Sequence, residues 1–211
     1  MLMYSVPPSL YCAKTRIVLR HKGLTWREEP PPGGYGSETY KQIIPSGNLP
    51  ALVDGALTLG DSEAIAEYLN DVHPTPAMLP ETATARAKIR ERGRLHDTRL
   101  EPALRAVFPH IPSTTRDENI VSGQGKALSF HLSVLAQHLD QTPHGNQLML
   151  CDCGFAISFE WMEALENHVG LALIWPKIVR KYRSDLAQHM AVRDELTSYR
   201  AHLKAYFEAS M

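Results

Sequence analysis

Few of the residues that mark a disulfide-rich or metal-binding protein occur in this sequence. It has only three cysteines in 211 residues, at Cys12, Cys151 and Cys153. None of them forms Cys-x-x-Cys spacing, so neither a disulfide framework nor a zinc site is indicated. The ten histidines include no His-Glu-x-x-His signature. We therefore expect reduced thiols and no bound metal.

Long apolar runs and an excess of charge are also lacking. No segment approaches the about 20 apolar residues that span a bilayer, and the N-terminus has no basic region followed by a long apolar one. The formal net charge of −1 gives no general attraction to nucleic acid or anionic membranes. We expect a cytoplasmic protein with neither kind of partner, long enough for one large or two small cores.

The first twenty residues predict a strand, a turn and a helix. Leu2 to Val6 reads as a short strand, Pro7-Pro8 as a turn, and the helix is expected from about Tyr11 to Lys22. Ser9 lies at the helix start with Cys12 three residues later. A helix N-terminus carries unpaired N–H groups and about half a positive charge, so it suits an anion or a thiolate. The simpler alternative is that Ser9 only caps the helix and Cys12 is a small buried residue.

The next fifty residues continue with strands and a second long helix. Leu24–Glu28 alternates like a strand, and 40–44 is at most a short helix. Asp54-Gly55 joins two further strands in a hairpin, and a helix starts at Ser62. The order βαβ–ββα is that of the thioredoxin fold.

After this point the chain predicts helices only. The proline-rich stretch Pro74–Pro80 marks a boundary, so we expect a first domain over residues 1–76, a linker over 77–84 and an all-helical domain over 85–211. The fold class is α+β. The expected helices are a long one over 84–108 that Pro102 kinks or splits, then others through 128–139, over 151–165, starting at Pro176, and through 196–207.

Three segments, in order, resemble the amino-terminal half of cytosolic glutathione transferases. They are the run Ser9–Arg16, the segment Asn48–Gly55 and the segment Gly60–Ile65. The first is similar to the Ser-x-x-x-x-Arg-x-Arg run of the serine-type classes (theta, tau and zeta). The helical second domain fits the same family, so the resemblance covers nearly the whole chain.

The resemblance implies a site for glutathione as co-substrate, without a metal. Ser9 would donate a hydrogen bond to the glutathione thiolate. The Leu49-Pro50 bond is cis in the family, so that Asn48, Leu49 and Pro50 would pair with the middle of the tripeptide. Asp61 and Ser62 would hold its γ-glutamyl end.

Other residues compete with Ser9 for the thiol chemistry. Cys12 could attack a disulfide if its pKa were depressed, but Ser9 stands where a glutaredoxin-like Cys-x-x-Cys would have its attacking cysteine. Tyr11 and Tyr4 are lesser rivals, because other classes use a tyrosine from this region. Tyr4 is expected on the strand, where packing is the simpler role.

The activity implied is a glutathione S-transferase that attacks a small hydrophobic electrophile. A glutathione-dependent isomerase or dehalogenase of a small organic acid, as in the zeta class, is an alternative. A non-catalytic binding or regulatory protein of the same fold is another, although such proteins tend to lose the thiolate donor or the γ-glutamyl clamp. The resemblance also implies a homodimer.

The sequence departs from the family pattern at the helix expected over 151–165. In relatives this helix opens with Ser/Thr-x-x-Asp, a capping box. Here Asp152 is present, but Met149 occupies the cap position. We expect a helix start weakened by about 1 kcal/mol.

A basic cluster follows Pro176. Lys177, Arg180, Lys181 and Arg183 share one predicted helix. They would meet an acidic substrate or, as such runs more often do, form a solvated helix face.

Overall fold

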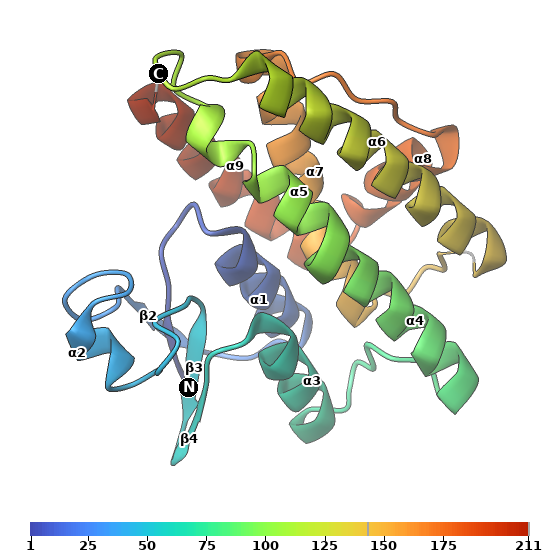
Figure 1. Ribbon diagram of the computed structural model, residues 1–211. Helices are drawn as coiled ribbons and strands as arrows, with labels where there is room; N and C mark the ends of the chain where they lie inside the picture. The colour runs from blue at the N-terminus through green and yellow to red at the C-terminus, as the bar shows by residue number, and fades with distance from the viewer. Residues whose placement is uncertain (143, 211) are drawn as a thin grey trace. The chain divides into compact units, whose positions relative to one another are not determined.

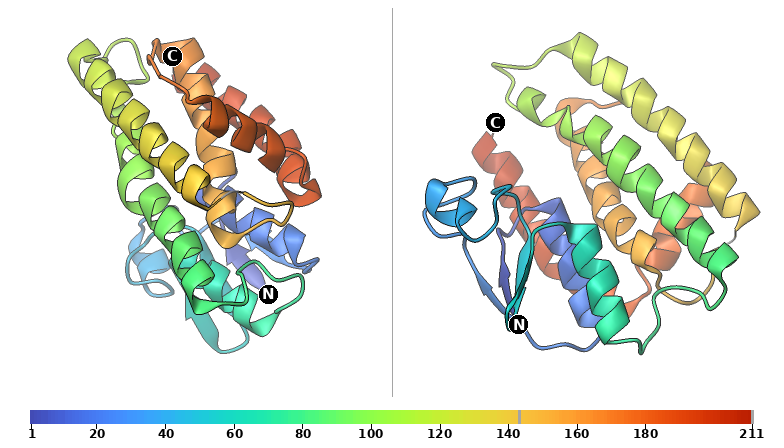
Figure 2. Two further views of the ribbon diagram at one scale, coloured as in Figure 1. Left: turned by 90° about the vertical axis from the view of Figure 1, so that its right-hand side faces the viewer. Right: turned by 60° about the horizontal axis from the view of Figure 1, so that its bottom comes forward.

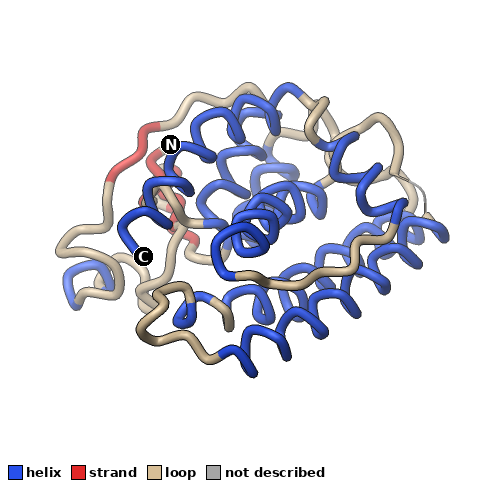
Figure 3. Tube along the Cα trace, turned by 90° about the horizontal axis from the view of Figure 1, so that it is seen from above, coloured by secondary structure: helices blue, strands red, loops and turns tan. Residues whose placement is uncertain are grey.

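A computed structural model describes residues 1–142 and 144–210 of the chain. It divides into two compact units, Met1–Met78 and Leu79–Met211, which are described in turn. Among the described residues, every strand belongs to the first unit, and the second consists of helices and loops (Figure 3). The fold class is the expected α+β arrangement.

The first unit is built on a four-stranded mixed sheet with the order β2-β1-β3-β4. The central strand β1 (Leu2–Tyr4) pairs in parallel with β2 (Arg27–Glu29), with Leu2 opposite Arg27. On its other side it pairs antiparallel with β3 (Ala51–Asp54), which forms a hairpin with β4 (Leu57–Leu59). This topology confirms the predicted thioredoxin-like fold.

Two long helices cover one face of this sheet. They are α1 (Leu10–His21) and α3 (Ser62–Val72), which lie side by side, and the short α2 (Glu38–Lys41) lies on the opposite side (Figures 1 and 2). The apolar positions of α1 and α3 recur at helical spacing, so they face the sheet. The core between them includes the fully buried side chains of Met3, Ile17, Leu52 and Leu69.

A buried lysine fastens the end of the first unit. Lys22 follows α1, and its Nζ donates to Oδ1 of Asn70 (2.9 Å) and to the carbonyls of His73 (2.7 Å) and Pro76 (2.6 Å). Burial lowers the pKa of this amine. The three acceptors hold the chain that leaves α3 against the end of α1.

The second unit is organised around α7 (Leu150–Val169), which packs against four other helices. Every residue of α7 from Leu150 to Met162 is buried, including Asp152, Ser158 and Glu160, as expected for a helix at the centre of a bundle. Its partners are α4 (Ala83–Leu95), α5 (Glu101–Arg105), α8 (Lys177–Leu186) and α9 (Met190–Ser210), and α6 (Glu118–Gln141) packs on α5 and α8. In the described part of the chain, no helix combines the length and the hydropathy of a membrane span.

The long helix predicted over 84–108 is interrupted. A single π-helical turn, η1 (His96–Leu100), separates α4 from α5, and Pro102 lies in the first turn of α5. Proline lacks an N–H and cannot donate to the preceding turn, so the helix splits at the expected place. The interruption turns the buried His96 ring toward Gly154 of α7.

Two helix starts in this unit carry details that the sequence left open. At α7, Oδ2 of Asp152 accepts from the N–H of Met149 at 2.8 Å, so the aspartate half of the capping box forms. At α8, Pro176 is the capping residue before the helix, because the helix begins at Lys177. The prediction that Pro176 is the first helical residue is therefore wrong by one position.

Candidate active site

Ser9 caps α1 through its side chain. Its backbone is extended (φ −68°, ψ 123°), and its Oγ accepts a hydrogen bond from the N–H of Cys12 at 3.3 Å. A hydroxyl has two acceptor lone pairs and one O–H donor. Capping uses an acceptor position only, so the cap itself leaves the Ser9 O–H able to turn toward a neighbouring group, either the Cys12 thiol or a ligand beyond the helix end. The two roles considered for Ser9 are compatible.

The turn before Ser9 is held by a buried arginine. Arg16 donates from Nη2 to the carbonyl of Pro7 at 3.2 Å and from Nη1 to Oε2 of Glu28 at 3.2 Å. Glu28 also accepts from Oγ of Ser5 and from Nε1 of Trp26 at 2.8 Å. This network connects the turn to both β1 and β2, and it fixes the position of the helix start.

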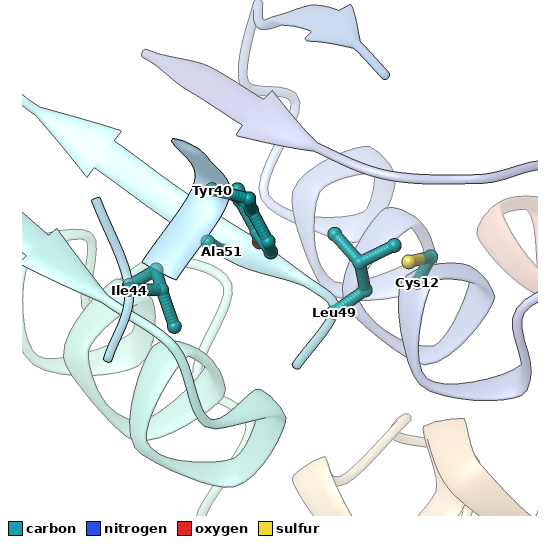
Figure 4. Packing of buried hydrophobic residues seen from close by; sticks show 5 residues of the cluster. All are labelled: Cys12, Tyr40, Ile44, Leu49 and Ala51. Carbon is teal, nitrogen blue, oxygen red and sulfur yellow. The ribbon is translucent and has the colours of Figure 1, made fainter. Parts of the chain in front are cut away.

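Cys12 is fully buried and belongs to a small apolar cluster. Its Sγ lies on the side that faces Leu49 (Figure 4). Burial raises the pKa of the thiol, and the hydrogen bond from Ser9, the Val6 backbone and the charge of Arg16 oppose this only in part. A thiol with a raised pKa is a poor nucleophile near neutral pH.

The segment before β3 is positioned by Tyr40. The Leu49-Pro50 peptide bond is cis, as expected. The hydroxyl of the fully buried Tyr40 donates to the carbonyl of Asn48 at 2.9 Å, and its ring meets that of Tyr4 edge-on at 5.7 Å. Within residues 1–142 and 144–210, the Leu49 backbone has no hydrogen-bond partner. Its N–H and carbonyl are therefore available to a ligand.

Asp61 is the capping residue of α3. One of its oxygens, Oδ1, accepts from the N–H groups of Glu63 and Ala64, both at 2.9 Å. Asp61 is exposed, whereas Ser62 is the first helical residue and is buried. The cap of this helix is therefore Asp61 and not Ser62. Behind the cap, Oε2 of Glu63 pairs with the buried Nζ of Lys14 at 2.6 Å.

These contacts bring three separate segments together in the first unit. The start of α1 meets the Leu49 segment through Cys12, and it is tied to α3 through the pair of Lys14 and Glu63. Tyr11 is half-buried on the first turn of α1, with its ring centre 5.9 Å from Nζ of Lys14. Tyr4 is part of the apolar cluster, in keeping with a packing role.

Two buried side chains that position the site were not predicted. Tyr40 and Arg16 act on Asn48 and Pro7, and these backbone carbonyls carry no signal in the sequence. Two features of the sequence hint that these side chains are buried. Tyr40 is a single tyrosine within a polar stretch, and Arg16 lies in the apolar face of a predicted helix.

The described donors and acceptors suit a charged, peptide-like ligand. They comprise a hydroxyl, backbone N–H groups at two helix ends, an unpaired main-chain segment and a carboxylate. In residues 1–142 and 144–210, no three side chains of His, Cys, Asp or Glu gather as they would around a metal ion.

Fold and site together define a thioredoxin-like protein with a helical second unit. The family model for the glutathione S-transferase N-terminal domain matches residues 3–77. A stringent starvation protein A homolog of Pasteurella multocida is 32% identical over 158 residues, which are 74% of this chain and 72% of that protein. The chain belongs to the glutathione S-transferase family.

Other relatives include enzymes of the family. Glutathione S-transferase Z2 of Arabidopsis thaliana is 39% identical over 88 residues, and this match spans only 40% of either chain. A bacterial maleyl pyruvate isomerase of the zeta class has a TM-score of 0.76 at 23% identity, covering 92% of this chain and 96% of its own. The theta-class enzyme of Xanthomonas axonopodis pv. citri, solved with glutathione bound, has a TM-score of 0.77 at 20% identity, covering 92% and 95%. These structures share the fold.

Proposed function

We propose that the protein is a glutathione S-transferase that binds glutathione on its first unit and activates the thiol for attack on a small electrophile. The observation that carries this proposal is the state of Ser9. Its Oγ is fixed at the N-terminus of α1 by an acceptor bond, so its O–H can donate to the thiolate of a bound ligand in place of the neutral Cys12 thiol.

The expected activation follows from two interactions. A serine hydroxyl does not deprotonate a thiol, but it stabilises the thiolate by a hydrogen bond of about 1.5–3 kcal/mol. The helix N-terminus adds about 0.3–1 kcal/mol. At 1.36 kcal/mol per pKa unit, the two lower the thiol pKa by about 1.5–3 units. Most bound glutathione would then be ionised at neutral pH.

The remaining residues would bind the rest of the tripeptide. The unpaired main chain of Leu49, between Asn48 and Pro50, is available for backbone pairing. Asp61 uses one carboxylate oxygen for its cap, and the other can receive the γ-glutamyl ammonium. Ser62 can offer its hydroxyl and its own N–H, at the start of α3, to the neighbouring carboxylate.

The test is the ultraviolet absorbance of the glutathione thiolate, followed from about pH 5 to pH 9 with wild type and with Ser9→Gly. We choose glycine because it costs a helix cap only a few tenths of a kcal/mol, whereas alanine costs about 0.5–2 kcal/mol. Wild type should ionise the bound thiol at least about 1.5 units below free glutathione, and Ser9→Gly should lose most of that shift.

Two matched variants isolate the contribution of the Ser9 hydroxyl. Ser9→Thr keeps both the cap and the donor, so it should keep much of the shift. Cys12→Ala removes the neighbouring thiol and should leave the shift in place, because burial already keeps that thiol protonated. Glutathione bound with an ordinary thiol pKa in wild type would contradict the proposal.

Two alternatives have support of their own. The 32% identity over 117 residues to a probable maleylacetoacetate isomerase of Drosophila melanogaster supports an isomerase or dehalogenase of a small organic acid, which would use the same thiolate. The longer match, to a Pasteurella protein whose name gives no enzymatic activity, supports a non-catalytic regulatory protein of this fold. Absence of glutathione binding to wild type would select the latter. We extend the proposal to two family features, a homodimer and a cytoplasmic location.

A further inference from the structure

A small cavity of about 200 Å³ lies in the second unit, between α7, α8 and α9. These helices pack against one another through α7 (Figure 2). Helical spacing explains how their faces meet: Val192, Leu196 and Arg200 recur every four residues on α9, as Ala156 and Glu160 do on α7. The cavity is thus built by the second unit alone, and none of the proposed glutathione-binding residues lines it.

Positive charge predominates in the cavity wall. Three guanidinium groups line it, those of Arg180, Arg183 and Arg200, against one carboxylate, that of Glu160. Each guanidinium carries five N–H donors, and the Glu160 carboxylate in the wall accepts from Arg183 and Arg200 only. The wall therefore offers hydrogen bonds to a further anion.

The buried carboxylate holds two of the arginines in place. Glu160 accepts from Nε of Arg200 at 2.7 Å and from Nη2 of Arg183 at 3.3 Å, and its side chain is only 6% exposed. Arg183 also pairs with Glu163 at 2.5 Å. The positive charges of Arg183 and Arg200 are therefore already neutralised by acidic partners. These ion pairs also fix both guanidinium groups in position.

Arg180 is different. Within residues 1–142 and 144–210 it makes no ion pair, and its guanidinium carbon lies 5.9 Å from the centre of the Trp175 ring. By contrast Lys181, the next residue, is paired with Asp185 at 2.6 Å. Of the basic cluster on α8, Arg180 is thus a cavity-lining cation without an acidic partner.

Part of the cavity wall is apolar. Leu186, Val192 and Leu196 are buried aliphatic residues that face the same space as the arginines. A volume of 200 Å³ corresponds to about seven waters at about 30 Å³ each, and it is below the about 300–1,000 Å³ of sites for drug-sized ligands. A nucleotide or a peptide is therefore too large.

We propose that this cavity binds a small organic carboxylate, with its anionic group on Arg180 and its apolar body against Val192 and Leu196. Benzoate is a suitable probe because it combines a carboxylate with a compact apolar ring. Benzamide has nearly the same shape without the charge. The ligand site is separate from the proposed glutathione site and does not depend on it.

The test is a titration of the isotope-labelled full chain with benzoate, followed by amide chemical shifts in NMR. Shifts should change for residues that line the cavity, such as Ala156, Ser184 and Val192. Benzamide should bind clearly more weakly, since it cannot pair with a guanidinium. Inorganic phosphate should also bind more weakly, since it lacks an apolar part.

Three variants make the test specific. Arg180→Gln should weaken benzoate binding about three- to tenfold, whereas Lys181→Gln, on the same helix but outside the cavity wall, should leave it unchanged. Ala187→Leu should abolish binding, because Ala187 lines the cavity and the larger side chain fills it. Thiolate absorbance with glutathione, recorded on the same variants, reports on the other site.

The following results would overturn the proposal. They are equal affinity for benzoate and benzamide, equal affinity of wild type and Arg180→Gln, shifts confined to residues outside the cavity, or no binding at all. Equal binding of phosphate and benzoate would reduce the cavity to a general anion site and would refute the apolar contact.

Discussion

At the scale of single residues, the site depends on side chains that bind no ligand themselves. Tyr40 is the clearest case. Its buried hydroxyl fixes the carbonyl of Asn48, the residue before the main-chain segment proposed to pair with glutathione. Burial raises the pKa of this phenol, so it remains a donor throughout the physiological pH range.

Tyr40→Phe tests this positioning role. Loss of the hydrogen bond should lower the free energy of unfolding by about 1 kcal/mol and weaken glutathione binding several-fold, as measured by urea unfolding and by calorimetry. Tyr68→Phe is the matched control, because it removes a hydroxyl that donates to Oδ2 of Asp54 at 2.9 Å, at the β3–β4 hairpin. Unchanged glutathione affinity in Tyr40→Phe would refute the role.

The predictability of the site also varies from residue to residue. Ser9 and Asp61 could be assigned to helix starts because a cap is a local arrangement, encoded within four residues. Tyr40 and Arg16 could not be assigned, since their partners are carbonyls that every residue possesses. Resemblance supplied the cis bond at Pro50, because the sequence alone favours trans at any X–Pro step.

At the scale of helices and strands, the π-helical turn η1 departs most from regular α-helical geometry. It directs the His96 ring into the space beside Gly154 on α7, where Nε2 lies 2.8 Å from Oγ of the buried Ser158 and Nδ1 lies 2.7 Å from Asp97. Ser158 is fully buried, so this serine, histidine and aspartate arrangement joins two helices and has no access for a substrate.

Gly154→Ala should therefore destabilise the second unit. A Cβ at this position would come within 2.5 Å of the His96 ring, which is held on both sides. Overpacking of this kind costs about 1–3 kcal/mol. Gly123→Ala on α6 is the control, since nothing lies within 4 Å of its added Cβ, and it should stabilise by about 0.4–1 kcal/mol. Urea denaturation of both variants measures the difference, and a stabilising Gly154→Ala would contradict the packing.

The elements themselves could largely be predicted from periodicity. The helices and the hairpin follow from apolar spacing and turn residues, and most of their ends are within a few residues of the expected positions. A break near Pro102 was expected, but its π-helical form and the packing of His96 against a glycine 58 positions later in the chain could not be foreseen. That fit is a property of packing, which one sequence does not display.

At the scale of the whole molecule, three histidines link stability to pH. His131, His138 and His144 all belong to the second unit, and burial lowers the pKa of each below the ordinary value of 6.5. The unfolded chain therefore binds protons more readily than the folded one in this range. Their contribution to stability is complete above about pH 6.5 and is lost as the pH falls from there toward the folded-state values.

We expect the free energy of unfolding to decrease between about pH 7 and pH 5. His144→Gln should reduce this pH dependence, whereas His202→Gln, which changes an exposed histidine on α9, should preserve it. Urea unfolding at several pH values, followed by tryptophan fluorescence, gives the measurement. A higher free energy of unfolding for wild type at pH 5 than at pH 7 would contradict this prediction.

The burial of all three cysteines has a practical consequence. Cys12, Cys151 and Cys153 are outside any disulfide and have at most 3% of their surface exposed, and burial raises the pKa of Cys12 and of Cys151. Maleimide dyes react with accessible thiolates, so the natural chain is a background with little labelling of its own. A single cysteine introduced at the exposed Ser184 would carry a fluorophore at the rim of the arginine-lined cavity, while the native thiols stay unmodified.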